Sequence, residues 1–394
     1  MALPRLELPA EVIEIAATLE GAGFEAWCVG GALRDRILRA GPGVDVDLAT
    51  SATPEQVQQI FKRTVPVGIK FGTVGVLDRN RVLHEVTTFR KDVSTDGRHA
   101  VVEYGVSIEE DLARRDFTVN ALAYHPTRHE WRDPFGGERD LADRIIRAVG
   151  NPPERFAEDY LRILRMIRFA LRLGFDIDPA TWAAAVAAAP GLDRLSAERV
   201  RDEWYKSLRT THVPERLVEL WWSSGAAAVW MPELRRSVQL TPGAGMDLPH
   251  VEVAMTACLA ERPGSVMRRL KASNAEITLG DKIERGPRAP AANDPVSARR
   301  WLAEVGDAAQ ALVAIAVFTV QPAPDWIMTV AGVWQRKEAT SRAQLAVTGT
   351  DLEAAGIPKG PELGRILGRL LDAVIEDPSK NSRETLLSLV RSWQ

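Results

Sequence analysis

The chain has 394 residues, of which 45% are hydrophobic and 26% are charged, so it is long enough for two or three packed domains. It carries 50 Lys and Arg residues against 53 Asp and Glu residues, which gives a net charge of −3. This balance excludes the strongly basic composition of a simple nucleic-acid-binding protein, although a local basic surface remains open.

The N-terminus and the cysteines indicate the compartment. The first 20 residues lack the apolar run of a secretion signal, and no segment is expected to have the apolar length of a transmembrane helix. Cys28 and Cys258 lie far apart and form no CxxC pair, which is typical of a reducing compartment. We therefore expect a cytoplasmic protein without membrane contact.

The first part of the chain alternates between predicted helices and strands. Apolar spacing, Gly pairs and Pro54 in a first helical turn predict helices over 11–23, 32–40 and 53–61, and strands over 26–31, 44–50, 72–77 and 82–89. This order predicts an α+β fold in which a mixed sheet is packed against helices. We expect this part of the chain to end near Gly150. Beyond Gly150, strand signals are scarce and a mostly α-helical remainder is expected.

A glycine pair and two aspartates form the first candidate site. Gly30-Gly31 between a strand and a helix exposes backbone N–H groups to an anion, and Arg34 in the first turn can reach a phosphate. Asp45 and Asp47 point to the same side of a strand, about 7 Å apart, which suits oxygen ligands for Mg²⁺. Each motif also has a plain structural reading, a tight turn and a solvated strand end.

Two further acidic residues follow. Glu85, on a predicted strand, is a third carboxylate that can activate an attacking hydroxyl or hold a metal, or else an exposed strand residue. Asp116 suits the N-cap of a helix over Phe117–Tyr124. The adjacent Arg114-Arg115 pair would be costly to bury without anions, so a nucleotide phosphate is the other interpretation.

A helix is predicted around residues 158–169. Arg162, Arg165 and Arg168 fall within an arc of roughly 120°, opposite the apolar residues. The face is either solvated, with an Asp159–Arg162 ion pair, or functional. A carboxylate accepts a hydrogen bond from an exocyclic amine, and a guanidinium donates to a ring nitrogen or carbonyl, so such a pair matches the edges of cytosine and adenine.

Other features stay open or are excluded. No GxxxxGK[ST] motif occurs, which excludes a P-loop. Residues 262–300 hold nine Lys or Arg against four acidic residues, an excess that suits either an RNA backbone or a mobile, soluble loop. The tryptophans of the helical part are expected in the core rather than as platforms for bases; they are Trp221, Trp222, Trp230, Trp301, Trp326 and Trp334.

Nine motifs in order resemble the class II tRNA nucleotidyltransferases, the CCA-adding enzymes, which share a polymerase-β-like nucleotidyltransferase head with bacterial poly(A) polymerases. They are GGALRD, DVDLAT, GIKFGTVGV, EVTTFR, TDGRHA, EDLARRDFTVNA, DPFGGERDL, RAVG and EDYLRILRMIRF. The resemblance covers residues 26–209 and resumes weakly at 348–371. TDGRHA together with EDYLRILR resembles the mitochondrial and α-proteobacterial branch, and the stretch 90–99 resembles the family's flexible loop.

The resemblance implies roles for matching residues. Asp45 and Asp47 would hold Mg²⁺ and, with Glu85, form the catalytic set. Asp159 and Arg162 would read the base, and Gly31 and Arg34 would contact the phosphates. The whole implied nucleotide-binding set is Gly31, Arg34, Arg115, Asp116, Asn120, Asp159, Arg162, Arg165 and Arg168.

The resemblance also implies an activity and a domain plan. The 3′ end of tRNA would receive C, C and A from CTP and ATP with release of pyrophosphate. The alternatives are a partial A-adding or CC-adding enzyme, a poly(A) polymerase, or a silent RNA-binding protein that kept the scaffold. The plan is a catalytic head (1–150), a nucleotide-selecting neck (151–210), a helical body (211–335) and a tRNA-binding helical tail (336–394).

Overall fold

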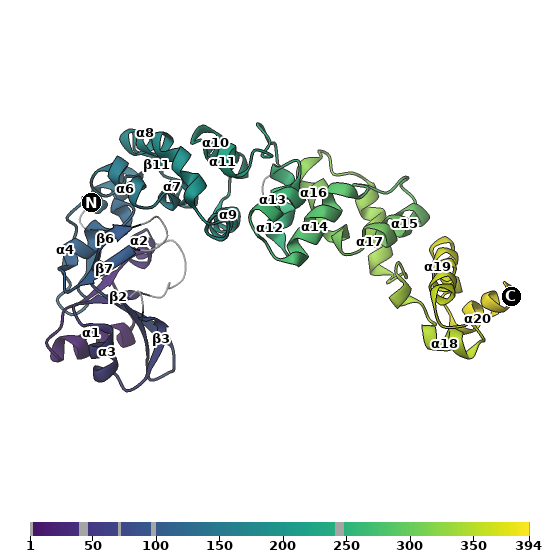
Figure 1. Cartoon of the computed structure of the whole chain (residues 1–394), viewed down its shortest axis with the longest axis horizontal. Coiled ribbons are helices and arrows are strands. Elements are labelled where there is room, and N and C mark those ends of the chain that lie inside the picture. The colour runs from purple at the N-terminus through teal and green to yellow at the C-terminus, as the bar shows by residue number, and fades with distance from the viewer. Residues whose placement is uncertain (1–2, 39–45, 70–71, 96–99, 241–247, 394) are drawn as a thin grey trace. The chain divides into compact units, whose positions relative to one another are not determined.

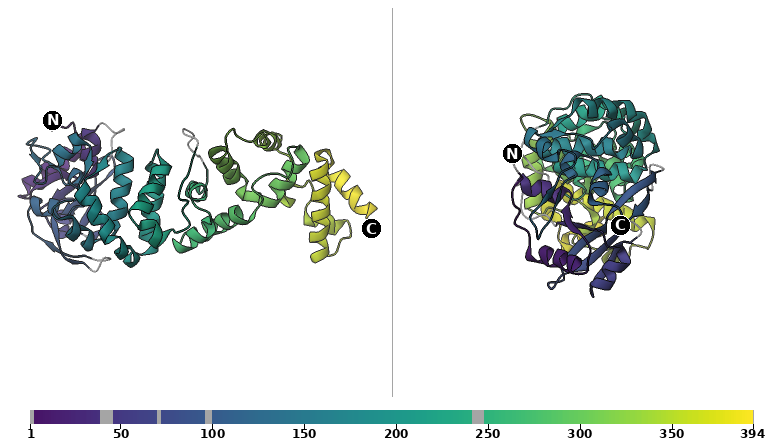
Figure 2. Two further views of the ribbon diagram at one scale, coloured as in Figure 1. Left: turned by 90° about the horizontal axis from the view of Figure 1, so that it is seen from above. Right: turned by 90° about the vertical axis from the view of Figure 1, so that its left-hand side faces the viewer.

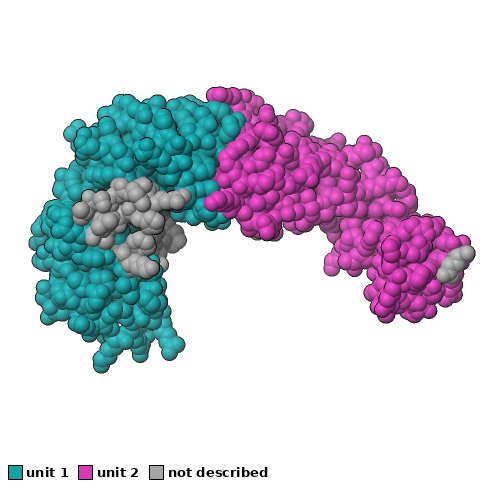
Figure 3. Space-filling view, in the orientation of Figure 1, with its two compact units in different colours: residues 1–232 teal, residues 233–394 magenta. Residues whose placement is uncertain are grey.

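The computed structural model describes residues 3–38, 46–69, 72–95, 100–240 and 248–393. The chain forms two compact units, residues 1–232 and 233–394, coloured separately in Figure 3. In Figures 1 and 2 the described strands belong to the N-terminal part of the chain, and the green and yellow part is helical.

Unit 1 contains a seven-stranded mixed sheet in the order β3-β4-β5-β2-β1-β8-β9. Its pairs are antiparallel except β2 and β5, which run parallel. The strands are β1 (Ala26–Val29), β2 (Asp47–Thr50), β3 (Thr64–Gly68), β4 (Thr73–Leu77), β5 (Leu83–Thr88), β8 (Ala123–Tyr124) and β9 (Trp131–Arg132). The prediction of a mixed sheet is confirmed, but β3 was not expected, because its Pro66 argues against a strand.

Helices of unit 1 cover the sheet and continue beyond it. They are α1 (Ala10–Gly21), α2 (Gly31–Ile37), α3 (Pro54–Ile60), α4 (Ile108–Ala113), α5 (Gly137–Asp143), α6 (Pro152–Glu158), α7 (Leu161–Leu173), α8 (Pro179–Ala188), α9 (Ala197–Thr210), α10 (Pro214–Ser223) and α11 (Ala226–Trp230). The described residues of the unit also include the 3₁₀ turns η2 (Thr118–Asn120) and η3 (Ala189–Arg194) and a short parallel pair, β10 (Ile145–Ile146) and β11 (Asp176–Ile177).

Local sequence explains several boundaries. The Thr53 hydroxyl accepts a hydrogen bond from the Gln56 backbone N–H, and Oε1 of Gln56 accepts one from the Thr53 backbone N–H, so a capping box starts α3 at Pro54. Gly30 precedes α2 with φ 86°, a conformation that L side chains rarely adopt. Apolar side chains form separate clusters, one including Leu19, Leu48 and Val86, and the other including Trp27, Phe89 and Leu112. The sheet is therefore buried on both faces over much of its width.

Two stretches of unit 1 differ from expectation. Residues 90–99 contribute β6 (Arg90–Thr95), which pairs antiparallel with β7 (Ala100–Tyr104), and residues 96–99 of the expected loop lie outside the described chain. The helix expected over Phe117–Tyr124 is wrong: only η2 forms, and Ala123–Tyr124 then pairs with β1. A short apolar run cannot distinguish helix from strand, and here the sheet recruits it.

Unit 2 is helical in its described residues, apart from an isolated bridge between Leu234 and Ala260. Its helices are α12 (Val251–Leu259), α13 (Pro263–Arg269), α14 (Asn274–Arg285), α15 (Pro295–Val305), α16 (Ala309–Thr319), α17 (Trp326–Gln335), α18 (Gly349–Ala354), α19 (Pro361–Glu376) and α20 (Arg383–Ser392), with the 3₁₀ turns η4 (Gly306–Ala308), η5 (Arg342–Gln344) and η6 (Pro378–Lys380). Leu352, Leu370 and Leu386 form the core of the C-terminal helices.

The basic stretch 262–300 is not a loop, because it forms α13, α14 and the start of α15. Acids from outside the stretch pair with it: Glu233 with Arg269, Glu338 with Arg299, Glu376 with Arg300 and Asp307 with Lys282. Trp221 and Trp301 are buried as expected, whereas 40% of Trp334 is exposed, so the core assignment is wrong for that residue.

One helical stretch of unit 2, Pro295–Thr319, is long and apolar enough to cross a membrane by length and composition alone. The expectation that no segment reaches this apolar length is therefore wrong. Gly306, with φ 57°, interrupts the stretch between α15 and α16. Both helices pack inside unit 2, α15 on α17 and α16 on α12, which is the packing of core helices.

Candidate active site

A cavity of about 600 Å³ opens in unit 1, bordered by α2, β2, the turn after α4, and the helices α7 and α9. Its lining is dominated by charge, with eight arginines (Arg34, Arg114, Arg115, Arg162, Arg165, Arg168, Arg172 and Arg199) against four aspartates (Asp35, Asp47, Asp116 and Asp159). An excess of guanidinium groups in a concave site suits a polyanionic ligand of nucleotide size.

The glycine turn forms one wall of this cavity. Gly30 and Gly31 both line it, and a Cβ on Gly30 would lie 3.4 Å from Nη1 of Arg115 and 3.6 Å from Oδ2 of Asp47. The turn therefore brings backbone, a carboxylate and a guanidinium close together. Arg34 is buried, with Nε and Nη2 donating to Oδ1 of Asp35 at 2.9 and 2.7 Å. Burial lowers the pKa of Arg34, and the neighbouring Asp35 opposes that change.

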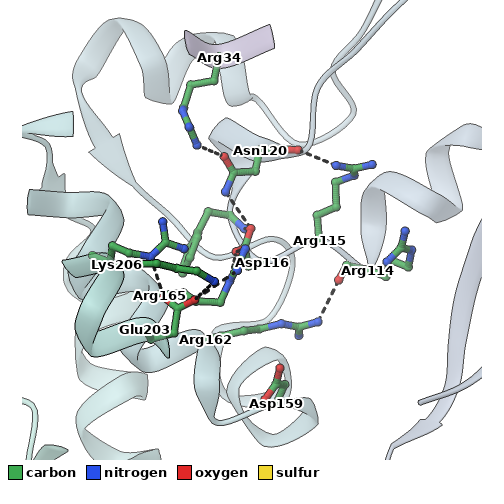
Figure 4. A network of polar contacts seen from close by, with 12 residues as sticks. Arg34, Arg114, Arg115, Asp116, Asn120, Asp159, Arg162, Arg165, Glu203 and Lys206 are labelled. Carbon is green, nitrogen blue, oxygen red and sulfur yellow. Dashed lines mark hydrogen bonds and ion pairs between the residues drawn. The ribbon is translucent and has the colours of Figure 1, made fainter. Parts of the chain in front are cut away.

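A relay of hydrogen bonds runs from Arg34 across the site (Figure 4). Nη1 of Arg34 donates to Oδ1 of Asn120, and Nδ2 of Asn120 donates to Oδ1 of Asp116 at 2.9 Å. Oδ2 of Asp116 then accepts from Nε and Nη2 of Arg165 at 2.8 and 2.6 Å. The sequence-predicted residues Asn120 and Asp116 thus connect the glycine turn with α7.

Asp116 is buried and both its oxygens are occupied within the protein. It does not cap an α-helix, because η2 begins at Thr118 with Phe117 before it. Burial alone would raise the pKa of Asp116, but Arg165 and the hydrogen bond from Asn120 hold it below its ordinary value. Asp116 is therefore an ionised group that orients Arg165.

The arginine face of α7 lines the cavity, while Ile163, Met166 and Ile167 on the other side are buried. The solvated interpretation of this face is wrong, since Arg162 and Arg168 are themselves more than 90% buried. Nε of Arg168 donates to Glu203 of α9 at 2.6 Å, and only 2% of Glu203 is exposed.

Phe169 lies among three of these cations. The guanidinium carbons of Arg34, Arg165 and Arg168 are 5.0, 5.3 and 4.2 Å from its ring centroid, within the range of cation–π attraction. The ring therefore supports guanidinium groups from both α2 and α7.

Asp159 and Arg162 do not form the ion pair that their spacing allows. The helix is broken between α6 and α7, where Asp159 has extended backbone angles, φ −154° and ψ 104°. Nη2 of Arg199 donates to Oδ2 of Asp159 at 2.7 Å, and the Leu161 N–H donates to Oδ1 at 3.0 Å. Each side chain is therefore oriented by other partners.

Arg162 is held from three sides. Its Nη1 donates to Glu158 at 2.5 Å and to the backbone carbonyl of Arg155 at 2.8 Å. Its Nη2 donates to the carbonyl of Arg114 at 3.0 Å, a contact drawn in Figure 4. A guanidinium has five N–H donors, so two of them remain for a ligand.

Arg114 and Arg115 share one buried acid. Oδ1 of Asp111 accepts from Arg114 at 2.8 Å, and Oδ2 accepts from Nη2 of Arg115 at 3.1 Å. Burial would raise the pKa of Asp111, but Arg115 and Arg114 hold it below the ordinary range. Nε of Arg115 is buried and has no hydrogen-bond partner among the described residues, so it is a donor available to a ligand.

The candidate metal carboxylates are described in part. Asp47 is exposed at the start of β2 and lines the cavity, whereas Asp45 lies outside the described residues. Leu48 pairs with Val86 in parallel register, so Asp47 and Glu85 stand one position earlier on neighbouring strands, and both side chains are exposed. Glu85 does not line the cavity. Among the described residues, no group of three or more His, Cys, Asp or Glu is placed to hold a metal ion.

The structure adds residues that the sequence did not single out. Arg172 follows Arg168 by four residues, which continues the helical spacing of Arg162, Arg165 and Arg168. Its guanidinium donates a hydrogen bond to Asp35 at 2.7 Å. That spacing was a usable signal. Arg199 and Glu203 reach the site from α9 through tertiary packing, and no local pattern marks them.

A mixed sheet that carries carboxylates on adjacent strands, beside an arginine-lined pocket and a glycine turn, defines a nucleotidyltransferase with a polymerase-β-like head. The family model "Poly A polymerase head domain" matches residues 26–147. "Probable RNA and SrmB- binding site of polymerase A" matches residues 174–237, and "tRNA nucleotidyltransferase domain 2" matches residues 252–390.

Whole-chain relatives narrow this class. The CCA-adding enzymes of Levilactobacillus brevis and Enterococcus faecalis are each 36% identical to this chain, over 95% and 97% of it and over 96% and 95% of their own lengths. The structure of the Bacillus stearothermophilus CCA-adding enzyme in complex with CTP is 31% identical, with a TM-score of 0.77 over 97% of this chain and 96% of that one. The chain belongs to the CCA-adding enzyme family.

These relatives do not support the branch suggested by the motifs. The expected closeness to mitochondrial and α-proteobacterial enzymes rested on TDGRHA and EDYLRILR, whereas full-length similarity is found with proteins of Levilactobacillus and Enterococcus. Two short motifs weigh less than identities spread along the whole chain.

Proposed function

We propose that the protein adds C, C and A to the 3′ end of tRNA from CTP and ATP without a nucleic-acid template, releasing pyrophosphate. One observation carries the proposal: a single cavity brings together the glycine turn, Asp47, and the Asp159 and Arg162 pair. In this proposal the phosphates, the reacting atoms and the base would all be held in this one cavity.

The base-reading part of the proposal rests on hydrogen-bond chemistry. The carboxylate oxygens of Asp159, one of them bound to Arg199, accept hydrogen bonds, so this side chain would favour the exocyclic amine of cytosine or adenine. Arg162 keeps two donors for ring acceptors, because its other three are bound to Glu158 and to two backbone carbonyls. Uracil and guanine would instead place a carbonyl oxygen against the carboxylate, and the repulsion between two acceptors would exclude them.

The phosphates would be held by cations around the glycine turn. Arg115 brings Nη1 close to Gly30 and has no partner for its Nε among the described residues, while Arg165 and Arg168 line the same cavity from α7. Asp116, Asn120 and Glu203 would act as positioning residues, because their polar atoms are engaged with these arginines and with each other.

Asp45 and Asp47 would hold Mg²⁺, since carboxylate oxygens are the ligands this ion prefers. The ion would supply charge stabilisation at the transferred phosphoryl group and lower the pKa of the attacking hydroxyl. Glu85, beside Asp47 by register, would either accept the proton of the tRNA 3′-hydroxyl or complete the ligand set.

The remaining expectations are part of the same proposal. The head, neck, body and tail division at 1–150, 151–210, 211–335 and 336–394 stays a prediction, as does a cytoplasmic location. The family membership favours tRNA as the partner, and it leaves open the partial A-adding or CC-adding enzyme as a second candidate.

A stepwise assay tests the proposal. The protein is incubated with three tRNAs that end at the discriminator base, at C and at CC, with CTP alone, ATP alone or both. Two C additions to the first tRNA and A addition only to the CC-ended tRNA are expected. Extension of the CC-ended tRNA alone would establish the partial A-adding enzyme, and tails of many A residues on unrelated RNA would establish a poly(A) polymerase.

A further inference from the structure

Asp159 lies where the backbone gives it little support. It occupies the two-residue break between α6 and α7, so neither helix fixes its side chain. Locally, only the Leu161 N–H contacts its carboxylate, at 3.0 Å and on Oδ1. One hydrogen bond to one oxygen leaves rotation of the carboxylate plane open.

The second oxygen is held by a residue 40 positions away. Nη2 of Arg199, in the first turn of α9, donates to Oδ2 of Asp159 at 2.7 Å. The two hydrogen bonds together fix the plane of the carboxylate and the direction in which its remaining lone pairs point.

The helix that carries Arg199, α9, is itself held in place. Glu203, one turn further along α9, forms a buried ion pair with Arg168 of α7, with atoms 2.6 Å apart. This contact fixes α9 against the same helix that carries Arg162. Arg162 is held independently by Glu158 and two backbone carbonyls. The distance between the Asp159 carboxylate and the Arg162 guanidinium therefore depends on Arg199.

We propose that Arg199 is a positioning residue for nucleotide choice: it holds Asp159 in the orientation that accepts from the amine of C or A and refuses U or G. This inference rests on the proposed base-reading role of Asp159 and Arg162. Both partners of the Arg199–Asp159 pair keep about a third of their surface exposed, at 32% and 27%, so the contact contributes little to folding stability.

The test compares selection rather than activity. The ratio of kcat/KM for CTP to that for UTP is measured on a tRNA lacking CCA, for wild type, Arg199→Leu, Arg199→Lys and Asp159→Ala. Arg199→Leu should lower the ratio about 10-fold, the low end of what one misplaced base contact costs. Arg199→Lys, which keeps the charge but not the planar fork, should recover part of it.

Arg201→Leu is the matched control. Arg201 lies on the same helix about 200° around its axis, pairs with Asp202 at 3.1 Å and does not line the cavity. Its ratio should equal that of wild type. In the double variant Asp159→Ala and Arg199→Leu, selection should fall no further than in Asp159→Ala alone, because Arg199 acts through Asp159.

The outcomes separate the two proposals. If Asp159→Ala loses selection and both Arg199 variants keep the wild-type ratio, the inference on Arg199 is wrong and the base-reading role stands. If Asp159→Ala keeps the wild-type ratio, the base is read elsewhere and both fail. Arg199→Lys keeps the test decisive should Arg199→Leu not fold, since thermal unfolding identifies that case.

Discussion

Two arginine-rich regions of this chain look alike in sequence and differ in structure. In unit 1, eight arginines converge on a cavity from α2, α7, α9 and the turn after α4. In unit 2, the cations of the stretch 262–300 are spread along three helices. Four of them pair with acidic residues from outside the stretch, namely Glu233, Asp307, Glu338 and Glu376. A count of charged residues along the sequence identifies both regions but does not distinguish one from the other.

The difference lies in what the acids do. Two acids at the cavity, Asp116 and Glu203, are buried and orient Arg165 and Arg168. The acids around 262–300 come close to cancelling the local excess. The Lys282–Asp307 and Arg300–Glu376 pairs are exposed, whereas the other two pairs include the buried Glu233 and Arg299. The first region is therefore the one suited to a ligand, because its arginines converge on one concave site instead of spreading along three helices.

The largest expected effect comes from removing a carboxylate of the cavity. Asp47→Ala and Asp45→Ala should each reduce nucleotide incorporation about 10³-fold, equivalent to several kcal/mol of lost transition-state stabilisation. Single-turnover incorporation measures the loss, and tRNA affinity should be retained. A near wild-type rate in either variant would remove the metal assignment for that residue.

A smaller effect is expected from Glu85→Ala, since Glu85 neighbours Asp47 by register but does not line the cavity. The single-turnover rate should fall by about 10²-fold, the lower range for general acid–base catalysis. His84→Ala, on the opposite face of β5, is the control for folding. An unchanged rate would make Glu85 an ordinary strand residue.

Stability tests the burial side of the comparison. Glu203→Gln leaves the buried Arg168 without its counter-charge and should lower the free energy of unfolding by about 3 kcal/mol. Arg300→Ala removes a pair with Glu376 in which both side chains are at least half exposed, so it should cost under about 1 kcal/mol. Urea unfolding followed by circular dichroism compares the two. Equal losses would contradict the distinction between the regions.

The smallest effect is expected from lowering the pH. Hydrogen bonds from Thr348 and Arg383 lower the pKa of the partly buried Asp351 to about 2. A carboxyl whose folded pKa is lowered stabilises the fold above its unfolded pKa and loses that contribution as pH falls, here from about 4 to about 2. Asp351→Asn should flatten the pH dependence of unfolding in this window. A slope unchanged from wild type would show that Thr348 and Arg383 do not favour the ionised form.

The sequence predicted those parts that local patterns encode. The start of α3 follows from Thr53, Pro54 and Gln56, and the inward apolar face of α7 follows from its spacing. Family motifs identified most of the residues that line the cavity, since GGALRD and EDYLRILR lie at fixed positions in the chain. The mixed sheet followed from the alternation of short apolar runs and helices.

Partners distant in sequence could not be predicted. Asp159 and Arg162 suggested an ion pair by spacing, but the break between α6 and α7 turns Asp159 toward Arg199. The run after Asp116 suggested a helix, yet Ala123 and Tyr124 joined β1. The basic stretch suggested a loop, because its counter-charges lie up to 76 positions away. Each error reflects tertiary contacts that override local preference.

The proline in β3 has a consequence for the free protein. β3 is an edge of the sheet, and it exposes Val65 and Val67 to solvent. An apolar edge of this kind invites a strand of another molecule to add to it. Pro66 offers no N–H, and the register shift between Val65 and Gly68 bends the edge, so a continuous ladder with an incoming strand cannot form. The proline therefore protects this edge of the sheet against edge-to-edge aggregation.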